Sequence, residues 1–279
     1  MENIPLLPAE LEREIFEISS RLYPSMIPTI LCVARRVHLW IEPLLYRVLR
    51  VDWSRKACAF LRAAESKPPA FFAAAVRHVW IPFYLDRSAD SKVAEALKRC
   101  TGVASLACNF NFGSDKLLPV LSAMRLQRLA VSLEHLFGRC QAINPAHPLF
   151  TRITHLFVLD NTGLPDRETS ICSALAALPA LTHLRVDGSL CWSVLEMLLA
   201  NCARLEILVV LWPTPGAGRI HAKATPFSDS RFVVGVEKDY WGDWEAGAAG
   251  LPDFWTRAEE FVAKKRRGVI DAGCFWMED

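Results

Sequence analysis

The sequence lacks the short motifs that mark most catalytic and nucleotide-binding sites. It contains no Gly-x-Ser-x-Gly, no Gly-x-x-x-x-Gly-Lys-Ser/Thr, no His-Glu-x-x-His and no Gly-x-Gly-x-x-Gly. Gly216-Ala217-Gly218 follows prolines and is too short to hold a phosphate, so it predicts a turn. Glu259 and Glu260 stand in a stretch with charges all along it, which indicates solvated side chains. We therefore expect neither catalysis nor a bound cofactor.

The chain also has almost no excess of one charge sign and no long uncharged run. Its 32 Lys and Arg residues against 30 Asp and Glu give a net charge of +2, which offers no electrostatic argument for nucleic acid or an anionic membrane as a partner. The most apolar window, residues 194–212, contains Glu196, Arg204 and Glu206, so we expect no membrane-spanning helix. The first residues carry no basic segment ahead of an apolar one, so no secretory signal is expected either.

Cysteine is present but without any pairing pattern. The nine cysteines are an odd number and form no Cys-x-x-Cys. We expect them to be reduced, mostly buried side chains of a cytoplasmic or nuclear protein, and neither a disulfide framework nor a zinc site. With 52% hydrophobic and 22% charged residues, the composition excludes a disordered chain.

Two amphipathic helical patterns lie between residues 7 and 49. Leu7-Pro8 ends an extended lead-in, and apolar residues then recur at helical spacing until Pro24; they are Leu11, Ile15, Ile18 and Leu22. A second helical stripe runs from Ile27 to Ile41 and ends before Pro43. Two short helices with this much apolar surface cannot bury it alone, so they need either the downstream chain or a partner.

This arrangement resembles the F-box, a helical module that docks onto a Skp-type adaptor of cullin ubiquitin ligases. The residues that carry the resemblance are Leu7-Pro8-Ala9-Glu10-Leu11, Ile15-Phe16, Val33-Ala34-Arg35-Arg36-Val37 and the segment from Trp40 to Arg47. Val37 stands where the family has an aromatic residue, and Trp40 follows three positions later. The resemblance implies that seven side chains bury against the adaptor: Leu7, Pro8, Leu11, Ile15, Phe16, Val33 and Trp40. The alternative is that the two helices only cap the downstream chain.

Downstream of residue 75, the pattern apolar-x-x-apolar-x-apolar occurs six times. The six segments span residues 76–81, 103–108, 126–131, 153–158, 181–186 and 205–210. Their fourth positions lie 23 to 28 residues apart. This spacing is typical of leucine-rich repeats, in which each unit supplies one strand and one helix, and it favours a stacked parallel sheet over an ordinary α/β fold.

The repeats are irregular. Asn111 and Asn161 fall where the leucine-rich-repeat family has its ladder asparagine, but the other four units have different residues there. The unit between residues 131 and 153 contains Asn144-Pro145 and His147-Pro148, which predicts a loop with only a short helix.

The segments that flank the repeats extend the pattern. Runs at residues 47–51 and 231–236 predict a strand at each end. Gly102 stands where a helix would end with a left-handed residue. Beyond residues 213–218 a turn-rich linker is expected, and the Trp-rich tail ends in a helix with Lys264-Lys265-Arg266-Arg267 at its carboxyl end. Because the open end of a stacked sheet requires covering, we expect the tail to cap the last repeat.

In parallel strands built from this pattern, the first, fourth and sixth positions point into the core, and the third and fifth positions share the concave face. The third positions are His78, Ser105, Arg128, His155, His183 and Ile207. The fifth positions are Trp80, Ala107, Ala130, Phe157, Arg185 and Val209. Neighbouring strands are about 4.8 Å apart, so His155 and His183 are expected side by side.

This concave face is the expected recognition site. The aromatic side chains of Trp80 and Phe157, with the polar side chains of His155, His183 and Arg185, have the composition of a protein-recognition patch. Two adjacent imidazoles could also bind a metal ion, but no third ligand is evident in the sequence, so we expect no metal site.

The sequence thus predicts an α/β protein with a short N-terminal helical F-box-like module, an irregular leucine-rich-repeat solenoid with a parallel sheet, and a C-terminal aromatic cap. The expected boundaries are 1–50 for the module, 51–75 for linking helices, 76–235 for the solenoid and 236–279 for the cap. By its resemblance to fungal F-box proteins with degenerate leucine-rich repeats, the chain is expected to be a substrate receptor that joins a Skp-type adaptor, and through it a cullin, to an unknown target protein.

Three alternatives remain open at this level. The first is an interaction scaffold without ligase association. The second is a sensor that binds a small molecule in the concave face. The third is a hydrolase with a cysteine nucleophile such as Cys191 near His183, although nothing in the sequence singles this cysteine out.

Overall fold

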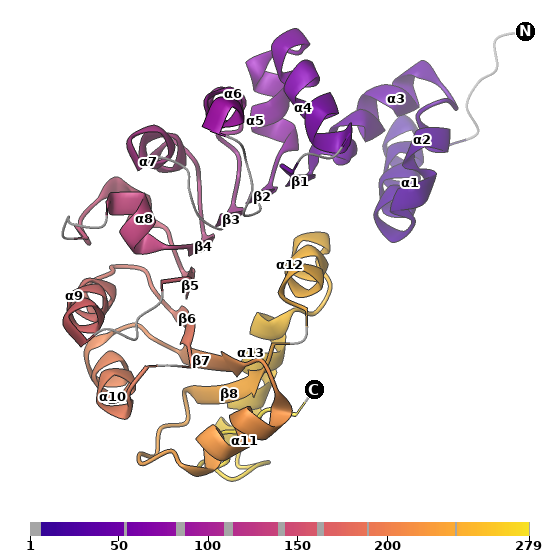
Figure 1. Ribbon diagram of the computed structural model, residues 1–279. Helices are drawn as coiled ribbons and strands as arrows, with labels where there is room; N and C mark the ends of the chain where they lie inside the picture. Colours follow the sequence, from indigo (N-terminus) through magenta and orange to yellow (C-terminus); the bar gives the residue numbers. More distant parts are fainter. Residues whose placement is uncertain are drawn as a thin grey trace, which may run out of the picture.

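Eight strands form one parallel sheet in which every strand lies beside its neighbours in the chain (Figure 1). The computed structural model describes residues 7–52, 55–81, 87–108, 114–138, 143–160, 165–188, 190–237 and 239–278. The strands are β1 (Val48–Arg50), β2 (His78–Ile81), β3 (Ser105–Cys108), β4 (Arg128–Val131), β5 (His155–Val158), β6 (His183–Asp187), β7 (Ile207–Trp212) and β8 (Phe232–Val236). The expected α/β class and parallel sheet are confirmed, including the added strand at each end.

The strand register follows the six-residue pattern. Residues at the third position pair in sequence, so that His78 lies opposite Ser105, Arg128 opposite His155, and His155 opposite His183. Residues at the first, fourth and sixth positions are buried in one continuous hydrophobic core. The pattern therefore fixes both the pairing and the face that each side chain occupies, because a shift by one residue would place the apolar set on the opposite face.

The helices that follow the strands cover the convex face of the sheet (Figure 1). They are α4 (Arg55–Ser66), α5 (Pro69–Ala75), α6 (Arg87–Leu97), α7 (Ser114–Ser122), α8 (Leu133–Phe137), η3 (Pro148–Thr151), α9 (Pro165–Ala176), α10 (Trp192–Asn201) and α11 (Pro215–Lys223). The short α8 and η3 confirm the expected loop-rich unit between residues 131 and 153. The ladder positions Asn111 and Asn161 lie outside the described residues.

Two predictions about local structure on this face are wrong. Residues 215–223 form α11 instead of a linker, because Thr214 caps the helix by accepting a hydrogen bond from Ala217 N and Pro215 suits its first turn. Gly102 has no left-handed backbone conformation. It is needed for space, since a Cβ there would lie 2.0 Å from Ala73 O and 2.2 Å from Arg77 Nη1. The Arg77 guanidinium donates to Gly102 O and Ala73 O and so joins consecutive units.

Gly102→Ala is expected to destabilise the fold by about 1–3 kcal/mol, because the carbonyl of Ala73 belongs to the backbone and cannot move without disturbing α5. Gly216→Ala is the matched control, since nothing lies within 4 Å of its added Cβ and alanine favours the helix. The measurement is the free energy of unfolding from urea titration of both variants. Equal stability of the two variants would contradict the packing role of Gly102.

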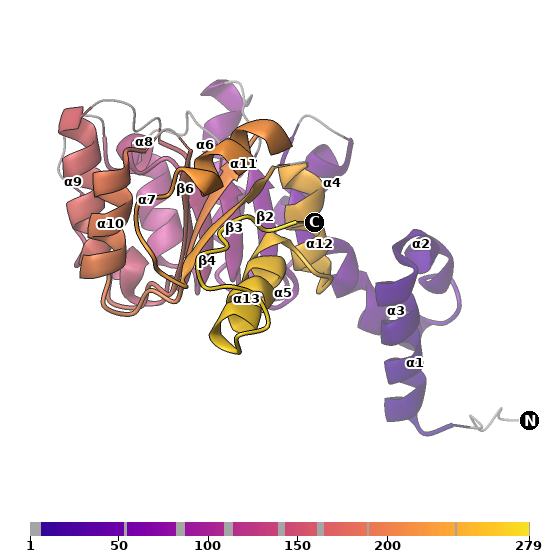
Figure 2. The same ribbon diagram turned by 90° about the horizontal axis from the view of Figure 1, so that it is seen from below.

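The N-terminal helices form a small body that projects from the β1 end of the sheet, as Figures 1 and 2 show from two directions. They are α1 (Ala9–Leu22), η1 (Pro24–Met26), α2 (Ile27–Ile30), α3 (Arg35–Ile41) and η2 (Glu42–Tyr46). The second predicted helix is thus divided, with Ala34 in extended conformation before α3. The predicted apolar stripe still forms this body's own core, in which Ile27, Ile30, Val37 and Ile41 are buried.

From the sequence we expect the C-terminal tail only to cap the last repeat. In the structure it also lies against the concave face of the sheet (Figure 1). Its helices are α12 (Tyr240–Ala249) and α13 (Phe254–Arg266). α13 contacts β7 and β8, and α12 reaches across to β1. The last described residues do cover the end of the sheet, because Trp276 forms a parallel bridge with Val234 of β8. The tail therefore closes both the concave face and the terminal edge.

The first unit of the sheet takes in residues on both sides of position 50. The sheet begins at Val48, and α4 and α5 pack in its core, so residues 51–75 belong to the first strand–helix unit and are not a separate linker. Among the helices described, none is both long enough and apolar enough to span a membrane.

Candidate functional site

One face of α1 is apolar and open to solvent. The side chains spaced along this face, Leu11 and Ile15 among them, are 48% and 50% exposed, and Ile18 and Leu22 continue the row. α1 is held to α3 from its other side, where the Arg36 guanidinium donates two hydrogen bonds to the Glu12 carboxylate, at 2.8 and 2.7 Å. A contiguous apolar surface of this kind on an ordered helix is typical of a protein-interaction site.

The structure divides the seven predicted adaptor-binding residues into two groups. Five are exposed, namely Leu7, Pro8, Leu11, Ile15 and Val33. Phe16 and Trp40 are instead half-buried and pack against the core of the N-terminal body. These two aromatic side chains therefore hold the helices together. The sequence pattern alone does not distinguish such packing residues from residues that contact the adaptor.

The expected recognition patch on the concave face is covered. Trp80 is only 3% exposed, and its ring stacks on Trp241 of α12 with centroids 3.7 Å apart. Phe157 packs edge-on against Tyr240 of the same helix at 5.2 Å. Trp80, His155, Phe157, His183 and Arg185 do occupy the predicted rows. The prediction that these side chains face an open surface is wrong, because the aromatic tail has the complementary apolar residues that cover them.

Arg185 is the buried centre of this contact. Its guanidinium lies 3.7 Å above the Phe157 ring, and the rings of Phe254 and Tyr240 lie at 5.0 and 5.1 Å. Its Nη2 pairs with the Glu237 carboxylate at the start of the tail. Burial lowers the pKa of Arg185, and the Glu237 carboxylate opposes this shift. One ion pair and three aromatic rings therefore stabilise the positive charge of the Arg185 guanidinium in this buried position.

The turn between α12 and α13 positions a second ion pair. Gly250 ends α12 in the left-handed conformation, at a φ of 83°, which glycine adopts without strain. Asp253 then caps α13 by accepting a hydrogen bond from Thr256 N through Oδ1, and its Oδ2 accepts one from Arg128 Nη1 of β4 at 2.9 Å. The tail is thus tied to the middle of the sheet.

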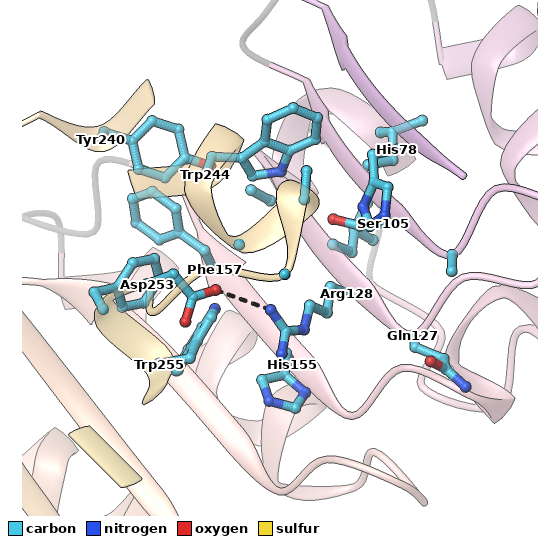
Figure 3. A pocket seen from close by; sticks show the side chains of 18 of the residues that line it. His78, Ser105, Gln127, Arg128, His155, Phe157, Tyr240, Trp244, Asp253 and Trp255 are labelled. Carbon is cyan, nitrogen blue, oxygen red and sulfur yellow. Dashed lines mark hydrogen bonds and ion pairs between the residues drawn. The ribbon is translucent and has the colours of Figure 1, made fainter. Parts of the chain in front are cut away.

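Between this turn and strands β2 to β5 lies a cavity of about 280 Å³. Figure 3 shows His78, Ser105 and Arg128 along its sheet side and Trp244, Tyr240 and the Arg128–Asp253 ion pair along its tail side. The lining combines aromatic rings with imidazole and guanidinium groups. It is the part of the concave face that the tail leaves unfilled.

His78 gives the cavity wall a pH response. Burial, and the nearby charges of Arg47 and Arg128, lower the pKa of His78 to about 4. The unfolded chain binds this proton near pH 6.5, so the stability that the neutral ring contributes is complete above pH 6.5 and is lost as the pH falls towards 4. When the pH falls from 7 to 5, the free energy of unfolding of the wild type is expected to fall by about 2 kcal/mol more than that of the His78→Gln variant, which has no imidazole at this position. Urea titrations at both pH values measure this difference, and identical losses would contradict it.

His155 and His183 lie side by side, as the register predicted. Their rings are parallel, with centroids 4.0 Å apart and planes 8° apart, and both meet the Trp255 ring of α13 edge-on. Burial lowers the pKa of His183 to about 4 and that of His155 to about 2, so both rings are neutral at pH 7. The Glu259 carboxylate of α13 lies 3.3 Å from His183 Nε2. Sequence reasoning missed Glu259 because its charged neighbours indicated a solvated helix face.

Ser132, His135 and Asp160 lie together but are not arranged as a nucleophilic triad. Ser132 Oγ contacts both His135 Nδ1 and Asp160, but the Asp160 carboxylate accepts hydrogen bonds from Leu133 N and Glu134 N and so caps α8. No imidazole stands between this hydroxyl and the carboxylate, as a triad requires. Cys191 precedes α10 on the convex side, whereas His183 lies under Trp255 on the concave side.

No protein-family model, no curated protein and no solved structure matches the chain.

Proposed function

We propose that this protein is the target-recognition subunit of a Skp/cullin-type ubiquitin ligase and docks onto the adaptor through its N-terminal helices. The observation that carries the proposal is the exposed apolar face of α1, on a body that projects from the sheet and leaves this face free. The resemblance of residues 7–47 to the F-box supplies the identity of the partner. The repeat spacing and the parallel ladder support a leucine-rich-repeat-like domain as the second part of such a receptor.

The exposed apolar side chains supply part of the binding free energy. Complete burial of one such aliphatic side chain is worth about 1.5–3 kcal/mol, and the half that is still exposed contributes roughly 1 kcal/mol. The available residues include Leu7, Leu11, Ile15, Ile18, Leu22 and Val33. Their sum is of the same order as the lower estimates of association cost, about 4 kcal/mol, so additional contacts from the adaptor side decide the final affinity.

The target is expected to bind the second part of the molecule without chemistry by this chain. Because the tail covers Trp80, Phe157, His155, His183 and Arg185, these residues contact a target only if the tail leaves the concave face. The cavity lined by Trp244, His78 and Arg128 is present with the tail in place, and the Arg128 side chain is 39% exposed. We therefore place the first target contact there.

The test is a calorimetric titration of the full chain with a purified Skp-type adaptor. The proposal predicts a 1:1 complex whose affinity changes little with salt, because the contact is apolar. An interaction scaffold without ligase association, the alternative, predicts no heat of binding with any Skp-type adaptor while binding of other proteins persists.

A further inference from the structure

Three possible metal ligands from three different elements converge at the amino ends of β5 and β6. His155 opens β5, His183 opens β6, and Glu259 lies on α13 above them. Glu259 Oε1 is 3.3 Å from His183 Nε2 and 3.9 Å from His155 Nε2. The three ligand atoms all lie within 4.8 Å of one another. This cluster is separate from the apolar face of α1 and independent of the function proposed for it.

Each of the two rings has a threonine hydroxyl beside its Nδ1. The Thr154 hydroxyl lies 2.9 Å from His155 Nδ1 and 3.2 Å from Gln127 O, and the Thr182 hydroxyl lies 2.8 Å from His183 Nδ1 and 3.1 Å from Thr154 O. When each hydroxyl donates to its carbonyl, the neutral imidazole has its N–H at Nδ1 and a bare lone pair at Nε2. This is the tautomer in which metal-binding histidines are held by an outer hydrogen bond.

Both Nε2 atoms are buried, and neither has a hydrogen-bond partner among the described residues. His183 is only 7% exposed, and its 3.3 Å approach to Glu259 does not make a hydrogen bond. The nearest cationic side chain, Arg128, donates to Asp253 instead. The two Nε2 atoms and the Glu259 oxygen thus lie within 4.8 Å of one another, and neither nitrogen has a hydrogen-bond partner among the described residues, a need that a bound cation would satisfy.

We propose that His155, His183 and Glu259 bind a divalent transition-metal ion, of which Zn²⁺ fits best. Two imidazoles and one carboxylate are a ligand set of tetrahedral zinc, whereas Mg²⁺ and Ca²⁺ prefer oxygen ligands throughout. The Glu259 side chain is 47% exposed, so the ion can enter beside it and keep water as a fourth ligand. On binding, the two rings must rotate out of their parallel stack, because ligand bonds at a tetrahedral ion point in well-separated directions whereas the lone pairs of parallel rings do not converge.

Metal binding would tie the tail to the sheet. The two imidazoles belong to neighbouring strands and the carboxylate to α13, so the ion bridges the two surfaces that meet at the concave face. An ion that binds only this closed arrangement stabilises it by mass action. Metal occupancy therefore favours the covered state of Trp80, Phe157 and Arg185.

The test is a Zn²⁺ titration of the full chain after chelator dialysis, with Glu259→Gln and Glu260→Gln as matched variants. Glu260 is exposed and adjacent but is not in the cluster. We expect one ion per chain, unchanged binding in Glu260→Gln, and a loss of roughly 10- to 100-fold or more in Glu259→Gln. Far-UV circular dichroism confirms that both variants are folded, and His183→Gln should match the effect of Glu259→Gln.

Cobalt(II) separates this site from the chain's nine cysteines. The proposed site predicts visible d–d bands without the near-ultraviolet charge-transfer band of a cobalt–thiolate bond. Absence of binding at micromolar Zn²⁺ would overturn the proposal. It would indicate that a proton shared between Glu259 and His183 occupies the space between the three side chains. Equal Zn²⁺ affinity in the wild type and Glu259→Gln, or a thiolate band with Co²⁺, would overturn it as well.

Discussion

Simultaneous replacement of Leu11 and Ile15 by Asp is expected to abolish adaptor binding while the fold persists. Both side chains are about half exposed on α1 and make no contribution to the buried core of the N-terminal body. In a complex, each substitution removes apolar burial and places a carboxylate in a dry contact. Together these terms amount to several kcal/mol, so we expect at least a 100-fold loss of affinity in the calorimetric titration.

Ile220→Asp is the matched control for this experiment. Ile220 is 71% exposed on α11, far from α1 in the chain, so it presents an apolar side chain of the same kind at a different surface. The control should bind the adaptor like the wild type. Equal loss in the control and the double variant would indicate non-specific hydrophobic association, and full binding by the double variant would show that α1 is not the docking face.

Glu237→Ala is expected to lower the free energy of unfolding by about 3 kcal/mol, because it leaves the Arg185 charge buried without its ion-pair partner. Within the described residues, Nε and Nη1 of Arg185 have no hydrogen-bond partner, so Nη2 provides the polar contact that is lost. The effect lies at the low end for a broken buried pair, since Glu237 is partly exposed and water can replace it in part. Urea or thermal unfolding of the variant measures the change.

The control for this second prediction is Glu278→Ala. Glu278 pairs with Arg219 at 3.4 Å, but both side chains are largely exposed. Such a surface pair contributes about 0–1 kcal/mol, so its loss should be small. If Glu237→Ala and Glu278→Ala have the same effect, then Arg185 is not isolated from solvent and the tail does not cover it.

The sheet could be predicted from the sequence because its signal is local and repeated. Each strand places an apolar residue such as Val79 or Leu156 at the same pattern position, and the regular spacing aligns the units. This arrangement also places His155 beside His183 before any coordinates are known. Helix α11 was missed because the glycines at 216 and 218 outweighed the Thr214-Pro215 start signal. Glycine is needed at 218 because a Cβ there would lie 2.4 Å from the Trp276 ring of the tail.

The tail and its contacts could not be predicted, since they depend on long-range complementarity. Trp241 meets Trp80 from a position more than 150 residues away in the chain, and no periodic pattern encodes such a pairing. A separation of 76 residues likewise hides Glu259 as a neighbour of His183. Phe16 and Trp40 were assigned to the adaptor surface because a motif gives residue identities but not the direction of each side chain.

Docking through the N-terminal helices can be measured by hydrogen–deuterium exchange of the full chain with and without a Skp-type adaptor. We expect the adaptor to slow exchange in residues 7–46, most strongly in α1, while the strands and the tail helices exchange as in the free chain. Unchanged exchange in α1, or protection confined to α12 and α13, would contradict the claim that the N-terminal helices dock the adaptor.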